Sequence, residues 1–351
     1  MPEGIKGFAM KRNILVLLLV LSMGFSCLFA AGNREGVPVN LSGFDATAAS
    51  PTDVRVIALK GPTSMGMVEL MDEAEAGPVA GNAYTFTIAS AIDEVTPKIV
   101  RGDVDIAAVP ANLASVLYNN TKGGIKVLAI NTLGVLYIVE SGDTVSSVED
   151  LRGRTIYASG KGATPEYALN HILSQNGIDP QKDVVIEWKS EHAECVAALA
   201  TASDGIAMLP QPFVTTAMTK NPKIRIALDM TRLWDDLQER SSAPSTLVTG
   251  VVVGRASFID QNPEAVASFL EQYAQSVSFV QRDIPRAAAL IGKYDIIPAA
   301  IAQKALPYCN IVCITGSELQ SKLSGYLSVL FERNPKSVGG ALPLDDFYYA
   351  L

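Results

Sequence analysis

Short apolar strand patterns alternate with amphipathic helical patterns in two successive series along this chain. The first series has strand-like runs at 54–59, 84–89 and 105–109, each followed by a turn and a helical pattern. A second series begins with strand-like runs at 155–158 and 184–187. A strand, a crossover helix and a further strand build a parallel sheet, because the helix returns the chain to the starting edge. The alternation therefore predicts an α/β protein with two sheets flanked by helices.

The chain passes between these two units more than once. Strand-like segments near 133–139 and 247–253 separate the first series from the second and the second from a mostly helical remainder. We therefore expect one lobe to be inserted in the other. Lobe 1 consists of residues 53–138 and 247–351, and lobe 2 of residues 139–246.

Size and charge exclude some classes of protein. A chain of 351 residues is long enough for about two domains. It carries a formal net charge of −8, and it contains no run of lysine and arginine. A nucleic-acid binder would need a basic stripe, so we expect no nucleic-acid partner.

The N-terminal segment resembles an export signal. Lys11 and Arg12 precede the apolar run 14–21, and small residues follow it. We predict a signal peptide at 1–31, with translation starting at Met1 or at Met10, and a polar tether at 32–52. Cys27 is either discarded with the signal or is the lipid-modified residue of a lipoprotein. Both interpretations place the protein outside the cytoplasm, and no other segment is expected to span a membrane.

A glycine-rich turn follows the strand-like run 155–158. Residues 159–165 read Ser-Gly-Lys-Gly-Ala-Thr-Pro, and a helical pattern begins at 166. Glycine allows a tight bend, Thr164 is placed to cap the helix, and Pro165 suits its first turn. The unpaired N–H groups of such a helix start favour a bound ligand. Nothing in this turn resembles an activated nucleophile.

Other strand ends carry small polar residues in the same way. Open α/β sheets bind ligands beyond the carboxyl ends of their strands, so we expect these ends to face one cleft. Each hydroxyl, such as that of Thr63 or Ser90, could instead be only a helix cap. The candidate ligand-binding residues are Thr63, Ser64, Met65, Ser90, Asp93 and Asn112 in lobe 1, and Ser159, Lys161, Thr164, Glu191, His192, Gln211 and Phe213 in lobe 2.

The residues that could ligate a metal or react are few. The chain has two histidines, and His171 lies inside a helical pattern, where a packing role is expected. We predict no catalytic residue, no metal site and no cofactor. Cys309 and Cys313 form a disulfide after export or are simply small buried residues, and Cys195 is assigned to the core.

Acidic residues cluster on the first predicted helix, at Glu69, Asp72, Glu73 and Glu75. One interpretation is a solvated helix face, which is usual for runs of charge. The other is a surface that docks a basic patch on a membrane partner.

Five motifs together resemble one family of binding proteins. They are the segments 109–114, 160–167, 208–213, 262–266 and 334–340, whose sequences are VPANLA, GKGATPEY, MLPQPF, NPEAV and NPKSVGG. In their order along 54–349, the chain resembles the substrate-binding proteins of ABC importers, in the nitrate, sulfonate, taurine and thiamine-precursor group.

The resemblance implies a two-lobed periplasmic-binding-protein fold of type II, a Venus flytrap, in which each lobe is a mixed, mainly parallel sheet flanked by helices. It also implies a monomer that closes on a small organic solute and delivers it to an ABC permease and, through the permease, to ATPase subunits. Membrane contact is then limited to the permease or a lipid on Cys27.

The resemblance leaves the ligand and two other functions open. Lys161 and the helix starts favour an anion such as a sulfonate, whereas Asp93, Glu191 and His192 favour a nitrogen heterocycle such as a thiamine precursor. Pyrimidine-synthase enzymes resemble the same group, but the cysteine cluster expected of them is not found here. A receptor for a transporter of another class is the third possibility.

Overall fold

The computed structural model describes residues 50–239 and 245–350. The predicted signal peptide, most of the predicted tether and Cys27 lie outside these residues. None of the helices in the described part is long and apolar enough to cross a membrane.

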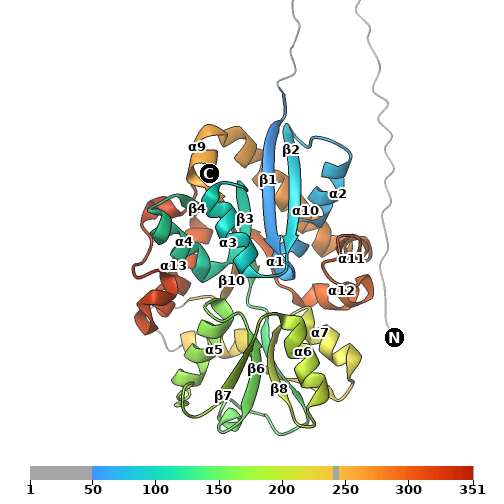
Figure 1. Ribbon diagram of the computed structural model, residues 1–351, viewed down its shortest axis with the longest axis vertical. Coiled ribbons are helices and arrows are strands. Elements are labelled where there is room, and N and C mark those ends of the chain that lie inside the picture. Colours follow the sequence, from blue (N-terminus) through green and yellow to red (C-terminus); the bar gives the residue numbers. More distant parts are fainter. Residues whose placement is uncertain (1–49, 240–244, 351) are drawn as a thin grey trace, which may run out of the picture. The chain divides into compact units, whose positions relative to one another are not determined.

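Strands from two distant parts of the chain form the six-stranded sheet of lobe 1 (Figure 1). The four strands that come first in the chain run in one direction, and the two that come last in the chain run against them. In spatial order, the strands are β11 (Ile311–Ile314), β4 (Ile125–Leu133), β10 (Val248–Arg255), β3 (Ile106–Pro110), β1 (Thr52–Leu59) and β2 (Asn82–Ala89).

The sheet of lobe 2 repeats this plan with five strands. Four of them run in one direction, and β5 runs against both of its neighbours. In spatial order, the strands are β7 (Val185–Lys189), β6 (Thr155–Ser159), β8 (Ile206–Pro210), β5 (Leu136–Ser141) and β9 (Ile224–Asp229). The prediction of mixed, mainly parallel sheets is therefore confirmed.

In each lobe, the single antiparallel strand in the middle of the sheet follows directly on a passage from the other lobe. β5 comes after β4, and β10 comes after the last helix of lobe 2. The predicted crossing strand 133–139 is interrupted, because β4 ends at Leu133 and β5 begins at Leu136. Gly134 lies between them, where an added Cβ would come within 2.2 Å of the hydroxyl oxygen of Thr231. The predicted return near 247–253 matches β10, while the residue-level lobe boundaries stay a prediction.

Helices cover both faces of both sheets (Figure 1). Four of the strands and α-helices were not predicted, namely β11, α1, α8 and α9. The helices of lobe 1 are α1 (Pro62–Met65), α2 (Val68–Glu75), α3 (Ile92–Arg101), α4 (Ala111–Thr121), α9 (Ala256–Gln261), α10 (Pro263–Arg282), α11 (Ile284–Lys293), α12 (Ala299–Ala305) and α13 (Gly316–Arg333). Those of lobe 2 are α5 (Thr164–Gln175), α6 (His192–Thr201), α7 (Phe213–Lys220) and α8 (Met230–Gln238).

One hydrophobic core runs continuously from lobe 1 into lobe 2. Buried residues of α4 and α13 belong to the same cluster as those of α5 and α8. At its centre, the Trp234 ring lies 5.5 Å from the ring of Tyr326 on α13 and 4.7 Å from the ring of His171 on α5. The lobes are thus joined by packing as well as by the crossing segments.

Asn112 adds a polar contact at this junction. It is fully buried at the start of α4, and its side-chain amide donates to the carbonyl oxygens of Gly162 in lobe 2 (3.2 Å) and Ser337 (3.1 Å). Its own side-chain oxygen accepts a long hydrogen bond of 3.4 Å from the hydroxyl of Thr164. Asn112 therefore holds the glycine-rich turn of lobe 2 against lobe 1.

Replacing Asn112 with alanine is expected to loosen this turn. The carbonyl oxygens of Gly162 and Ser337 would lose a buried partner, which costs about 1–3 kcal/mol of folding free energy. Denaturant unfolding should show this loss, and amide hydrogen exchange should speed up at 160–164.

Asn119→Ala is the matched control for this change. Asn119 lies on the same helix, but its side chain binds only the C-terminal segment, at Val338 and Ala341. The Asn119→Ala variant should leave the rate of amide hydrogen exchange at 160–164 unchanged. Equal exchange rates at the turn in the two variants would contradict the role given to Asn112.

His171 should make the fold sensitive to acid. Burial, with a smaller contribution from Arg333, lowers its pKa to about 4. Neither ring nitrogen has a hydrogen-bond partner among the described residues. The folded state therefore favours the neutral imidazole. The resulting contribution to the free energy of unfolding is fully present above pH 6.5 and is lost as the pH falls toward 4. The full loss is about 3 kcal/mol.

The measurement is the free energy of unfolding between pH 7.5 and 4.5 for the wild type and His171→Phe. Phenylalanine keeps an aromatic ring beside Trp234 and cannot be protonated. The variant should lose less stability over this range than the wild type does. Parallel pH profiles would show that His171 does not carry the effect.

Candidate functional site

The ends of equivalent strands from the two sheets surround one cavity of about 340 Å³. In lobe 1 its walls follow β1, β2 and β3, and in lobe 2 they follow β6, β7 and β8. These strands occupy the same places in the two sheets. The cavity is therefore the cleft predicted from the polar residues at the strand ends, and its volume suits a small molecule.

Seven of the predicted residues line this cavity. Three come from lobe 1 and four from lobe 2, and they are Thr63, Ser90, Asp93, Ser159, Lys161, Glu191 and His192.

The other six predicted residues lie elsewhere. Ser64 and Met65 are fully buried in α1. Asn112 and Thr164 meet at the lobe junction described above. Phe213 lines an adjoining cavity of about 310 Å³, and Gln211 lines a separate one. A ligand-binding role for these six stays a prediction that the cavity walls do not support.

The cavity also has polar residues that the sequence analysis missed. Lys60 directly follows β1, Lys189 is the last residue of β7, and Ser190 comes next. Thr249 lies in β10. The same strand-end rule would have found the first three. Thr249 faces the cavity because β10 crosses the middle of the sheet, and no local signal marks it.

Two of the helices at the cavity are capped by glutamates of their own. Glu94 accepts hydrogen bonds from the N–H groups of Ser90 (3.1 Å) and Ala91 (3.0 Å). Glu194 accepts one from the N–H of Ser190 (3.0 Å) at the equivalent place in lobe 2. The two sites share the spacing Ser-x-x-x-Glu. The interpretation of Ser90 as a helix cap is therefore wrong, since the glutamate four residues later has that role.

The glycine-rich turn is also closed by a carboxylate. Glu166 accepts a hydrogen bond of 2.6 Å from the N–H of Gly162. The N-cap of α5 is Ala163, so Thr164 is the first helical residue and not the predicted cap. At the start of α1 in lobe 1, the hydroxyl of Thr63 donates a hydrogen bond to the carbonyl oxygen of Leu59, and the N-cap there is Gly61. The expectation of unpaired N–H groups is corrected at Gly162, where a negative charge already occupies the helix start.

Gly160 shows why this turn needs glycine. Its φ angle is +83°, and an added Cβ would lie 2.8 Å from the Cγ of Pro165. A side chain would thus be strained and would also strike the proline ring. The tight turn brings Ser159 and Lys161 to the cavity wall.

Ser159 and His192 form the closest side-chain pair in the cavity wall. The Ser159 hydroxyl lies 2.5 Å from Nδ1 of His192, and the imidazole packs 4.9 Å from the ring of Phe213. Burial lowers the pKa of His192 to about 4. The imidazole is therefore neutral near pH 7 and presents one N–H donor and one nitrogen acceptor.

The charges at the cavity are unequally compensated. Lys60 pairs with Asp295 at 3.2 Å, and Lys189 pairs with Glu187 at 3.0 Å. Within the part of the chain that the structure describes, the other three charged residues of the wall form no ion pair. They are Asp93, Lys161 and Glu191.

The three cysteines within the described residues are free thiols. Cys195 and Cys309 are buried and Cys313 is half-buried. The disulfide considered for Cys309 and Cys313 is thus not formed in this structure, and the Cys309 thiol donates to the carbonyl oxygen of Ala305. No group of three or more potential metal ligands occurs among residues 50–239 and 245–350.

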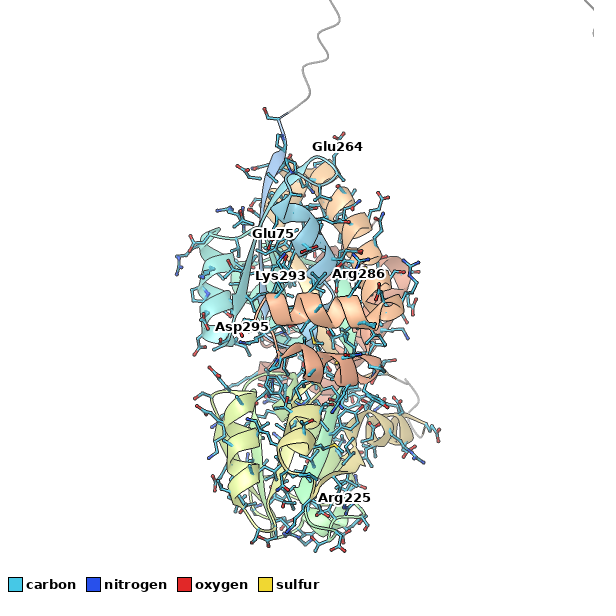
Figure 2. All side chains as sticks on the ribbon, turned by 90° about the vertical axis from the view of Figure 1, so that its right-hand side faces the viewer. Glu75, Arg225, Glu264, Arg286, Lys293 and Asp295 are labelled. Carbon is cyan, nitrogen blue, oxygen red and sulfur yellow. The ribbon has the colours of Figure 1, made fainter. Side chains whose placement is uncertain are left out.

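The acidic cluster on α2 divides into two pairs. Lys293 of α11 binds both Asp72 (2.6 Å) and Glu75 (2.7 Å), and Figure 2 shows Lys293 beside Glu75. Glu69 and Glu73 remain the other pair. Partial burial and then the charge of Glu73 raise the pKa of Glu69.

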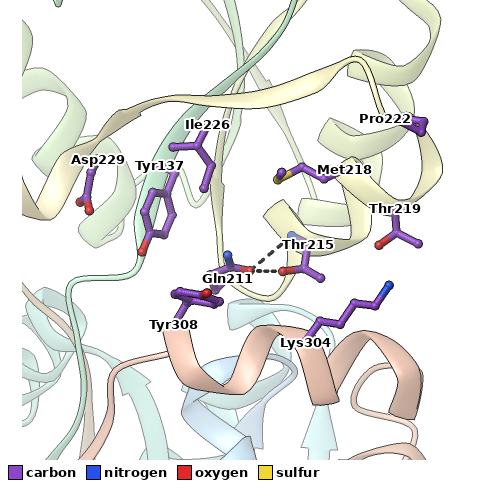
Figure 3. A pocket seen from close by; sticks show the side chains of 10 residues that line it. All are labelled: Tyr137, Gln211, Thr215, Met218, Thr219, Pro222, Ile226, Asp229, Lys304 and Tyr308. Atoms are coloured by element: carbon purple, nitrogen blue, oxygen red, sulfur yellow. Dashed lines mark hydrogen bonds between the residues drawn. The ribbon is translucent and has the colours of Figure 1, made fainter.

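A further cavity of about 750 Å³ contains Gln211 (Figure 3). The side-chain oxygen of Gln211 accepts hydrogen bonds from the N–H (3.3 Å) and hydroxyl (2.9 Å) of Thr215. This cavity lies between α7 and β9 of lobe 2 and the α12 region of lobe 1.

Solved structures share this fold over nearly their whole length. An ABC transporter from Parabacteroides distasonis is 20% identical with a TM-score of 0.70, and the match covers 85% of this chain and 99% of that one. The alkanesulfonate-binding protein SsuA from Xanthomonas axonopodis pv. citri, bound to MOPS, is 16% identical with a TM-score of 0.65 and coverages of 85% and 96%. The periplasmic aliphatic sulphonate binding protein SsuA from Escherichia coli is 15% identical, with a TM-score of 0.65 and coverages of 83% and 96%. The predicted periplasmic-binding-protein fold is thereby confirmed.

No curated protein matches the sequence. A family model described as "NMT1/THI5 like" matches residues 95–287, which is more than half of the chain. The matched region includes the glycine-rich turn, the Ser159–His192 pair and all of lobe 2 beyond β5. This chain therefore belongs to the NMT1/THI5-like family.

Proposed function

We propose that this protein is an extracytoplasmic solute-binding protein that delivers a small organic molecule to an ABC importer. The observation that carries the proposal is the cavity into which equivalent strand ends of both lobes bring hydrogen-bonding groups. A solute in this cavity contacts both lobes, so closure of the lobes adds contacts and is favoured by binding. The family and the ABC-transporter relatives support the same role.

The charges favour a ligand that carries hydrogen-bond donors or a positive charge. Two of the three uncompensated charged residues in the wall, Asp93 and Glu191, are acidic. Glu94, Glu166 and Glu194 already occupy the helix starts that would otherwise attract an anion. The neutral His192 offers both a donor and an acceptor. We therefore favour a thiamine-precursor-like nitrogen heterocycle and keep a sulfonate, held by Lys161, as the alternative.

An enzyme on the same fold is the second candidate. The observation that favours it is the Ser159–His192 pair, which has the contact distance of a nucleophile and its base. Ser159 is, however, only 2% exposed, and its hydroxyl is suited to orienting His192. Cys195 is buried in lobe 2, whereas Cys309 and Cys313 lie in lobe 1, so the described residues place no cysteine cluster at the cavity. Chemical change in pyridoxal phosphate incubated with the purified protein would favour the enzyme.

The ligand class is tested by a binding screen with paired variants. Pyrimidine precursors of thiamine and alkanesulfonates are screened by thermal shift, and the best ligand is measured by calorimetry. A ligand at about 100 times its Kd should stabilise the fold by roughly 2.7 kcal/mol. We expect a pyrimidine to bind, and Asp93→Asn with Glu191→Gln to weaken it about tenfold, since a charged hydrogen-bond partner is lost.

Lys161→Gln is the paired variant, and Glu264→Gln on the remote α10 is the neutral control. Both should leave pyrimidine binding nearly unchanged. Strong binding of a sulfonate that depends on Lys161 and not on Asp93 or Glu191 would reverse the assignment of the ligand. Failure of every ligand to bind would count against the solute-binding function itself.

Docking on the permease is expected to use Glu69 and Glu73. Asp72 and Glu75 are engaged by Lys293, which leaves the other pair for a basic patch on the partner. Charge reversal at both positions should abolish uptake in cells and leave the Kd of the ligand unchanged. Glu264→Lys, which reverses one charge elsewhere on lobe 1, serves as the control. Normal uptake by the double variant would exclude this surface.

A further inference from the structure

The cavity of about 750 Å³ that Figure 3 shows has different lining residues from the main cleft. The main cleft follows β6 and β7 at one edge of the lobe 2 sheet, whereas this cavity is lined by β5 and β9 at the other edge. We call it the rear cavity. Its volume is within the range of roughly 300–1,000 Å³ that is usual for small-molecule sites.

Exposed apolar side chains gather in the rear cavity. Tyr308 is 58% exposed, and Met218 and Ile226 are each 39% exposed. Tyr137 adds a second aromatic ring, and Figure 3 shows the two tyrosines approaching Gln211 from the two lobes. Aromatic faces and a thioether are favourable partners for a flat ring.

The two ends of the rear cavity carry opposite charges. Figure 3 shows Asp229 beside Tyr137 at one end and Lys304 at the other. Neither forms an ion pair with any residue in the described part of the chain. One oxygen of Asp229 caps α8 by accepting from the N–H groups of Thr231 and Arg232. The second oxygen is therefore the one that can accept from a ligand.

Tyr137 and Asp229 are direct neighbours on paired strands. Burial, and then the charge of Asp229, raises the pKa of Tyr137 to about 12. The phenol is thus neutral at physiological pH, and its ring face stays attractive to a cation. A carboxylate beside two tyrosines favours a cationic group attached to an aromatic ring.

The rear cavity shares two segments of its wall with the main cleft. Leu136 lines the cleft, and its neighbour Tyr137 lines the rear cavity. In the same way, Pro210 lines the cleft and Gln211 lines the rear cavity. Lys304 and Tyr308 come from lobe 1, and the remaining lining residues come from lobe 2. An occupant would therefore contact both lobes and press on the segments that form the cleft.

We propose that the rear cavity is a second small-molecule site, which binds a protonated aromatic amine with its ring against Tyr137 and Tyr308 and its ammonium group at Asp229. The site is distinct from the cleft assigned to the transported solute. Its occupant bridges the lobes without entering that cleft.

The test uses tryptamine as the probe and the purified protein. Calorimetry and ligand-observed NMR should show binding, and Asp229→Asn should weaken it about tenfold through loss of the charged partner. Asparagine is as good a helix cap as aspartate, so α8 and the fold are preserved. Tyr308→Ser should weaken binding about fivefold, and this exposed position tolerates the change.

Two controls locate the site and the charge preference. Glu191→Gln, in the main cleft, should leave the Kd of tryptamine unchanged. Indole-3-acetate has the same ring and a negative charge, and it should bind at least tenfold more weakly than tryptamine. The proposal is overturned if tryptamine does not bind, if Asp229→Asn leaves its affinity intact, or if Glu191→Gln abolishes binding.

Discussion

The passage of the chain between its two sheets is the constraint on which the whole structure depends. In both sheets, the one antiparallel strand between parallel neighbours is placed there by a segment that has just left the other lobe. This pairing gives the sheets the same order and brings equivalent strand ends to a shared cavity. Gly134 permits the first passage, because there is no room for a side chain beside Thr231. The binding of a solute that contacts both sets of strand ends therefore depends on the relative position of the lobes.

The equivalence of the lobes extends to their helix starts. Glu94 and Glu194 cap corresponding helices, and Glu166 closes the glycine-rich turn. Backbone N–H groups that could hold an anionic ligand are thus partly neutralised by the protein itself. Under the proposed function, specificity then depends on the side chains of the cavity, above all on Asp93, Glu191 and the neutral His192. This is the physical basis for preferring a nitrogen heterocycle to a sulfonate.

Much of the fold could be predicted from the sequence, because strand and helix periodicities in this chain are strong and regular. The strand-end rule also placed Ser159 and His192 at the cavity. It failed for Ser64 and Met65, which belong to a short helix turned into the core. The cap predicted at Thr164 was wrong because the helix starts one residue earlier and Thr164 bonds across the lobe junction. The rear cavity could not be predicted, since it joins Tyr137 to Tyr308 from distant parts of the chain.

The central claim is that the two lobes close on an unreacted solute held between their strand ends. The most direct measurement is the distance between spin labels on Val100→Cys in α3 and Ala200→Cys in α6, with Cys313 replaced by serine. These helices follow equivalent strands on opposite sides of the cavity. The account predicts a shorter distance when the best ligand is saturating, with the ligand recovered chemically unchanged. An identical distance distribution with and without that ligand would contradict it.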